Sequence, residues 1–223
     1  MFKKWIIGII ILSFISIIIT VTFTLIPNNH QPKYSNIVKP INTLPIIVEK
    51  KEVTYVNGHI IVNKAYALPP DYKPEENKKA RYQLNKLLEK AKKKHLDLKY
   101  ISGYRSYNEQ EEVVKSYIEE EGKRMANQYT AKPGHSEHQS GLAFDVGTQR
   151  HLEDFHNDFE HTKEAKWLEK NASKYGFIIR YPKGQSNETG YAYEAWHLRY
   201  VGSELAKIID NQDTNLESYY KLK

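Results

Sequence analysis

Apolar residues recur along the chain with the periods of short helices and short strands. Over residues 74–95 they form a stripe with the 3.6-residue period of a helix, and over residues 141–147 they alternate with other side chains as in a strand. Further strands are predicted over residues 59–63, 97–102 and 177–181, and further helices over residues 106–121, 162–175 and 203–210. Because the strands are few and do not form a clean strand–helix–strand series, the pattern favours an α+β fold over a doubly wound α/β fold.

Cap residues predict the ends of two of these helices. Ser106 with Glu109 three residues later has the pattern of a capping box, and Gly122 predicts the end of the helix that it opens. Thr162 and Gly176 delimit the next predicted helix in the same way.

A long uncharged run occupies most of the N-terminal region. Residues 5–26 carry no charge, and a helix needs roughly 20 such residues to cross a bilayer. Lys3 and Lys4 precede the run, so residues 1–26 are predicted to be a cytoplasmic stub and a transmembrane signal anchor. The run ends without a small-residue cleavage site, which favours an anchor over a cleaved secretory signal. We therefore expect a single-pass protein of the cell membrane with an extracytoplasmic domain.

Residues 27–52 are predicted to be an extracytoplasmic linker. Four prolines lie among polar residues there, which is typical of an extended, stiffened tether. The remaining residues, 53–223, show no repeat and no low-complexity tract, and their number suits one domain. We expect this domain to carry the function.

Composition and charge exclude several classes of protein. The 223 residues are 40% hydrophobic and 27% charged, which excludes a wholly disordered chain. Cysteine is absent, so disulfide scaffolds and thiolate chemistry are excluded. The net charge is +6, and without Lys3 and Lys4 residues 27–223 carry +4 (31 minus 27), which would suit contact with an acidic cell-surface polymer. No basic stripe indicates a nucleic-acid partner.

Two segments carry residues typical of a metal site. His138 precedes Asp145, which interrupts an apolar strand pattern where an unpaired carboxylate would be costly to bury. Glu194 and His197 are three residues apart and share a face on a helical turn, or across a turn leaving a strand. Each segment alone also fits a simpler interpretation: a surface aspartate with a loop histidine, or a hydrogen-bonded histidine at a strand end.

Taken together, the two segments fit one catalytic zinc site. Catalytic zinc typically has three nitrogen or oxygen ligands from the protein and a water in the fourth position. His138, Asp145 and His197 provide such a set, and Glu194 is left over as a base for proton transfer. Glu137 is a second carboxylate near the ligands and thus an alternative base.

Four strings of residues resemble the VanY-type D-alanyl-D-alanine carboxypeptidases and the related LdcB-type L,D-carboxypeptidases. They occur in the family's order and lie at residues 102–110, 133–145, 174–182 and 193–202. The resemblance implies one zinc ion on His138, Asp145 and His197, with Glu194 as the catalytic base. It also implies an α+β fold of the Hedgehog/D-Ala-D-Ala peptidase type.

The resemblance further implies a site for the substrate's terminal residue. Arg105 would bind the free C-terminal carboxylate, which an arginine can hold with two parallel hydrogen bonds. Gln110 and Ser136 would help to bind the terminal D-alanine. His135 is expected to line the cleft rather than to bind metal, and Arg199 and Tyr200 are weaker candidates for stabilising an oxyanion.

These expectations describe a membrane-anchored zinc D-alanyl-D-alanine carboxypeptidase that trims peptidoglycan stem peptides. An L,D-carboxypeptidase that acts on tetrapeptide stems is the main alternative, because both groups share the quoted strings. A non-catalytic cell-wall binding module is a further alternative, although all three predicted ligands and the predicted base are present.

Overall fold

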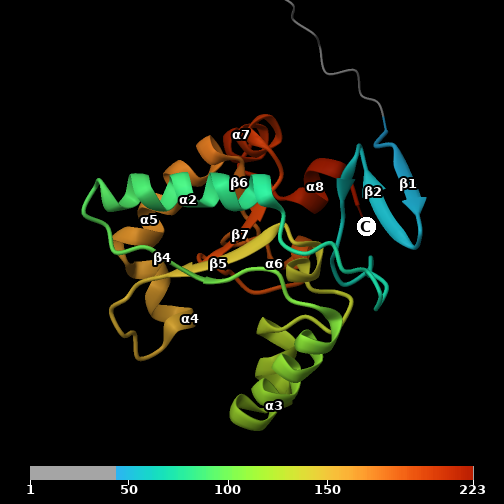
Figure 1. The fold of residues 1–223 in the computed structure, drawn as a ribbon, viewed down its shortest axis with the longest axis horizontal. Helices are drawn as coiled ribbons and strands as arrows, with labels where there is room; N and C mark the ends of the chain where they lie inside the picture. Colours follow the sequence, from blue (N-terminus) through green and yellow to red (C-terminus); the bar gives the residue numbers. More distant parts are fainter. Residues whose placement is uncertain (1–43, 223) are drawn as a thin grey trace, which may run out of the picture. The chain divides into compact units, whose positions relative to one another are not determined.

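A computed structural model describes residues 44–222, which form two antiparallel sheets surrounded by helices (Figure 1). The smaller sheet has the order β1-β2-β3, formed by Ile47–Lys50, Val53–Val56 and His59–Ile60. The larger sheet has the order β4-β5-β7-β6, formed by Lys99–Ser102, Ala143–Gly147, His197–Tyr200 and Phe177–Ile179. All pairs of neighbouring strands are antiparallel, so the predicted α+β fold is confirmed.

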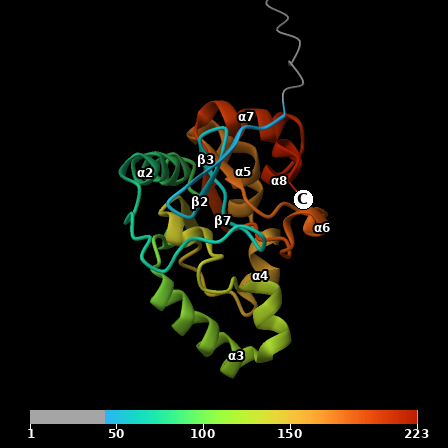
Figure 2. The same cartoon turned by 90° about the vertical axis from the view of Figure 1, so that its right-hand side faces the viewer.

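Helices of very different length connect the strands. Two are long, and the others have nine residues or fewer. The α-helices are α2 Lys78–Lys92, α3 Tyr107–Tyr129, α4 Phe155–Asp158, α5 Lys163–Asn171, α6 Ser186–Thr189, α7 Ser203–Asn211 and α8 Leu216–Tyr220. The short 3₁₀ turns are η1 Glu137–Ser140, η2 Phe159–His161 and η3 Ala172–Tyr175. Helices α2 and α3 lie on opposite sides of the larger sheet (Figures 1 and 2).

Side-chain alternation divides the larger sheet into an apolar face and a polar face. Phe144, Val146 and Leu198 point toward α2 and α5 and are fully buried with the apolar residues of those helices. Asp145, His197 and Arg199 alternate with them and therefore point to the other face. Helices α2 and α5 thus pack on the apolar face of the sheet, and the polar side chains of β5 and β7 lie on the other face.

The structure agrees with most of the predicted elements and corrects some of their ends. The capping box at Ser106 is present, and Thr162 caps α5 through the backbone N–H of Ala165. Helix α3 does not end at Gly122: this residue is a kink with φ 81° and ψ 160°, and the helix continues to Tyr129. A glycine tolerates this backbone conformation, so the chain changes direction there without terminating the helix.

Strands β1, β2 and β7 were not among the predicted elements. Strand β1 lies within the predicted linker, residues 27–52, and it pairs with β2 through Val48 and Tyr55, among other residues. The predicted anchor, residues 5–26, lies outside the described residues. Over residues 44–222 we find no helix that has both the length and the apolar character to cross a membrane.

Candidate metal centre and active site

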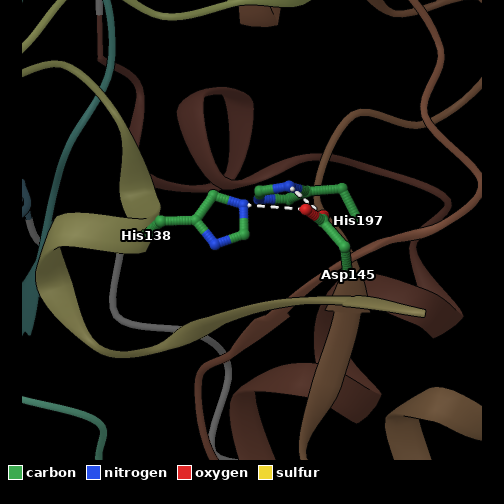
Figure 3. Close-up of side chains that lie close together, drawn as sticks. All are labelled: His138, Asp145 and His197. Carbon is green, nitrogen blue, oxygen red and sulfur yellow. Dashed lines mark hydrogen bonds and ion pairs between the residues drawn. The ribbon is translucent and has the colours of Figure 1, made fainter. Parts of the chain in front are cut away.

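The strand register brings the three predicted metal ligands together. Asp145 of β5 pairs directly with His197 of β7, so both side chains project from the polar face of the sheet. His138 reaches them from the turn η1, just before β5 (Figure 3). One oxygen or nitrogen of each residue lies within 4.8 Å of the others. Their side chains are 6%, 16% and 6% exposed for His138, Asp145 and His197, so the cluster is largely shielded from water.

Hydrogen bonds fix how His138 and Asp145 face each other. The Nδ1 of His138 lies 2.7 Å from the carbonyl oxygen of Gly103, to which it donates, so Nε2 is left to face the Asp145 Oδ2 at 3.2 Å. The hydroxyl of Ser102 donates to the same oxygen at 2.6 Å. Outer partners of this kind orient the ligands of a metal and raise their basicity.

The ring of His197 has a carboxylate on each side. Its Nδ1 lies 3.1 Å from Asp145 Oδ1 and 3.7 Å from Glu194 Oε2. Its Nε2 has no hydrogen bond and lies 3.7 Å from Glu137 Oε2, which is also buried without a partner. A proton on Nε2 directed at Glu137 would leave Nδ1 free to bind a cation between Asp145 and His138.

The cluster therefore fits a zinc ion on chemical grounds. Two imidazole nitrogens and one carboxylate oxygen are a known ligand set for catalytic zinc. Glu194 lies beside His197 because a backbone hydrogen bond of 3.2 Å, from His197 N–H to the Glu194 carbonyl, closes a tight turn before β7. This turn leads into a strand, whereas the sequence predicted a turn that leaves one.

Burial and charge shift the pKa values of this cluster. Burial raises the pKa of Glu194 to about 8. Burial alone would lower the pKa of His197, but the carboxylates of Asp145 and Glu137 beside its two ring nitrogens raise it to about 10. Burial would likewise raise the pKa of Asp145, but His138 and His197 hold it well below its usual range. In the metal-free cluster His197 is therefore protonated at neutral pH, and a cation that binds there would compete with this proton.

Glu137 belongs to a buried network of four charged side chains. Its Oε1 accepts hydrogen bonds from Arg180 Nε at 2.7 Å and from Arg199 Nη1 at 2.6 Å. Arg180 also donates to both oxygens of Glu217, at 2.8 and 2.5 Å. The arginines hold the pKa of Glu137 far below its usual range against the effect of burial. The lowered pKa makes the Glu137 carboxylate a weak base, so it is poorly suited to be the alternative base.

The cluster lies in a cavity of about 170 Å³ that also contains the predicted substrate-binding residues. Arg105, Gln110 and Ser136 all line it. The Arg105 guanidinium donates to Gln110 Oε1 at 2.8 Å, and Gln110 Nε2 donates to the Ala131 carbonyl at 2.8 Å. This chain of hydrogen bonds directs the arginine toward the cavity from the start of α3.

Three other candidates lie elsewhere. His135 does not line this cavity: it contacts the Asn63 carbonyl oxygen at 2.7 Å and lines a neighbouring one. Arg199 is buried against Glu137 and the carbonyl oxygens of Ile60 and Tyr200, so its donors are not directed at a substrate. Tyr200 is on the apolar face of the sheet.

Sequence reasoning missed the two network partners Arg180 and Glu217. Arg180 stands out in the sequence only as a single charge within the predicted strand 177–181, where an unpaired charge would be costly to bury. Glu217 lies near the C-terminal end with no pattern to distinguish it. Tyr181 and Tyr191, which also line the cavity, carry no distinctive sequence signal either.

A buried His/Asp/His set with the carboxylate of Glu194 beside it and an arginine in the same cavity defines the site of a metallopeptidase-type hydrolase. The sequence model of the VanY family, described as D-alanyl-D-alanine carboxypeptidase, matches residues 73–203. The chain belongs to the VanY family of carboxypeptidases, as the resemblance predicted.

Relatives and solved structures agree with this assignment. YodJ of Bacillus subtilis (strain 168) is 37% identical over 210 residues, which are 86% of this chain and 75% of YodJ. The LdcB LD-carboxypeptidase structure has a TM-score of 0.73 and 41% identity, covering 80% of this chain and 96% of that one. A vancomycin-resistance D,D-pentapeptidase VanY in complex with Zn(II) has a TM-score of 0.63 and 31% identity, covering 72% and 97%.

Proposed function

We propose that this carboxypeptidase depends on one zinc ion and removes the C-terminal D-alanine from peptidoglycan stem peptides. The observation that carries the proposal is the single cavity that contains His138, Asp145 and His197 beside Glu194, together with Arg105. Solved relatives were described with Zn(II), with D-alanine-D-alanine and in terms of peptidoglycan recognition, which supports the same chemistry here.

The ligand set would be His138, Asp145 and His197, as the sequence predicts. Zinc bound there would lower the pKa of a water molecule to about 7 and polarise the scissile carbonyl. Glu194, whose Oε2 is 3.7 Å from His197 Nδ1, would accept the proton of the attacking water and pass it to the leaving amine. Its burial in the cavity keeps that proton away from bulk water.

Arg105 would bind the free carboxylate of the terminal D-alanine. The hydrogen bond from Arg105 to Gln110 fixes the guanidinium, so little side-chain freedom is lost when a carboxylate binds. Ser136, which lines the same cavity, would also contact the terminal D-alanine. A requirement for a free carboxylate would make the enzyme act at chain ends rather than within a peptide.

Two specificities remain candidates, and each has its own support. The description of the matched family favours a D,D-carboxypeptidase, in which the residue before the terminal D-alanine is also D-alanine. The higher identity to the LdcB LD-carboxypeptidase, 41% against 31% for VanY, favours an L,D-carboxypeptidase acting on tetrapeptides. The two bonds differ in the residue before the terminal D-alanine, in its configuration and in its side chain.

We further propose that the catalytic domain acts outside the cytoplasm and is attached to the cell membrane by residues 5–26. The support is the uncharged run in that segment with Lys3 and Lys4 before it. Peptidoglycan is outside the membrane, so this location would bring the cavity to its substrate.

A direct test is mass spectrometry of stem peptides incubated with the zinc-loaded full-length chain. Loss of one alanine from a pentapeptide, abolished by a chelator, is the result expected for the D,D activity. Conversion of a tetrapeptide to a tripeptide would support the L,D activity instead. If neither peptide loses alanine while both still bind, a non-catalytic cell-wall binding module becomes the better account.

A further inference from the structure

A second cavity adjoins the catalytic one. It has a volume of about 340 Å³, and Thr130 and Tyr191 line both cavities. The segment 130–136 forms part of each wall: Ala131 and Ser136 line the catalytic cavity, whereas Lys132 and His135 line the second one. The loop that would hold the terminal residue of a substrate therefore also presents basic side chains just beside it.

The charge of the second cavity is opposite in sign to that of the metal cluster. Its lining includes Lys64, Lys132 and His135 and no carboxylate, whereas the catalytic cavity contains three carboxylates. Within residues 44–222, neither lysine forms an ion pair. Lys64 Nζ lies 4.6 Å from the centre of the Tyr191 ring, which holds its charge close to the boundary between the two cavities.

The catalytic cavity can accommodate only the end of a peptide. Its volume of about 170 Å³ is below the roughly 300–1,000 Å³ of sites that enclose drug-sized ligands. A peptide whose terminal carboxylate is held by Arg105 must therefore extend out of this cavity. The second cavity is the adjoining space, and its free positive charges would attract a negative group on the emerging chain.

We infer that Lys64, Lys132 and His135 form a subsite, called here the basic subsite, for a free carboxylate of the substrate upstream of the scissile bond. The inference rests on the proposed function, because it assumes a peptide bound by its C-terminal end. Stem peptides carry such carboxylates where a residue with two carboxyl groups is linked through only one of them. Amidation of that carboxylate removes the charge, so the subsite would discriminate between amidated and free forms.

Binding can be measured without turnover by using the full-length, zinc-loaded Glu194→Gln variant. The probes are the pentapeptide L-alanyl-γ-D-glutamyl-diaminopimelyl-D-alanyl-D-alanine and two derivatives, one amidated at the glutamyl carboxylate and one at the diaminopimelyl carboxylate. We expect one of the two amidations to weaken binding about 3- to 10-fold in calorimetry at low salt. The amidation that does so identifies which carboxylate the basic subsite binds.

The double substitution Lys64→Ala and Lys132→Ala, added to the same background, should weaken binding of the free peptide to the level of that amidated form and abolish the difference. Lys86→Ala is the matched control, because Lys86 also lies over a tyrosine ring, Tyr82, but on α2. Equal binding of all three peptides, or a preference that survives in the double variant, would overturn the basic subsite. A preference for the free peptide that the two lysine substitutions abolish, together with no alanine release by the unmodified enzyme, would overturn the proposed activity alone. Absence of any binding would overturn both.

Discussion

Replacing Glu137 by Gln removes one charge from a group of four that has almost no contact with water. The side chains of Glu137 and Arg180 are fully buried, and that of Arg199 is 1% exposed. With Glu217 the group carries two negative and two positive charges, so its net charge is zero. The substitution keeps the shape of the side chain and an oxygen that can accept hydrogen bonds, but it leaves one buried positive charge without compensation.

Arg199 is the residue that this substitution leaves unpaired. Arg180 keeps its two hydrogen bonds to the carboxylate of Glu217, whereas Arg199 loses its carboxylate partner and is left with neutral acceptors, including the carbonyl oxygens of Ile60 and Tyr200. Removing one partner of a buried ion pair costs about 3–5 kcal/mol. For a domain of this size that corresponds to a decrease in melting temperature of roughly 6–20 °C.

The assay is thermal unfolding of the metal-free, full-length protein, followed by circular dichroism in the presence of a chelator. Glu112→Gln is the matched control, because Glu112 forms an exposed pair with Lys115 on α3 and should change stability by less than about 1 kcal/mol. The double variant Glu137→Gln with Arg199→Met should recover part of the loss, since it restores a neutral network. A loss for Glu137→Gln no larger than that of the control would refute the argument that this charge compensates the arginines.

Three further predictions concern the active site. Glu194→Gln should retain zinc, measured by metal analysis, and lose at least about 100-fold in alanine release because the base is absent; normal turnover would exclude Glu194 as the base. Arg105→Ala should lower kcat/KM by about 30- to 900-fold, or about 2–4 kcal/mol, and Arg105→Lys should recover only part; an unchanged kcat/KM would remove Arg105 from the substrate site. Zinc binding at pH 7.5 should release about one proton from His197, whose pKa of about 10 keeps it protonated without metal, so affinity should rise with pH up to about that value. Calorimetry in buffers of different ionisation enthalpy measures this proton, and a binding enthalpy independent of the buffer would contradict the prediction.

The sequence was sufficient to predict that His138, Asp145 and His197 lie close together, but not which strand pairing brings them together. Side chains alternate between the two faces of a strand, so the pattern over residues 141–147 places Asp145 on the face opposite to Phe144 and Val146. This pattern alone left open whether Asp145 faces solvent. What brings it to His197 is the antiparallel register between β5 and β7, which pairs the two residues directly. Register depends on contacts between strands that are more than 50 positions apart in the chain, so a local pattern could not supply it.

The helix ends were predictable where a side chain marks them locally. Ser106 and Thr162 each accept the hydrogen bond that a cap requires. Gly122 was misleading because a glycine with positive φ is compatible with either the end of a helix or a kink between two helical segments. Which of the two occurs depends on the residues that follow, and these continue α3 to Tyr129.

The buried network extends the active site beyond the segment that the family model matches. Residues 73–203 include all the predicted ligands, the base and both arginines, Arg180 and Arg199. They do not include Glu217 of α8, the second carboxylate for Arg180, or Ile60 of β3, whose carbonyl accepts from Arg199. Without these two groups, one carboxylate, that of Glu137, would face two buried arginines and would have to compensate both while it also faces His197. The small N-terminal sheet and the C-terminal helix are therefore part of what holds the third ligand in position, even though neither contributes a residue to the metal cluster.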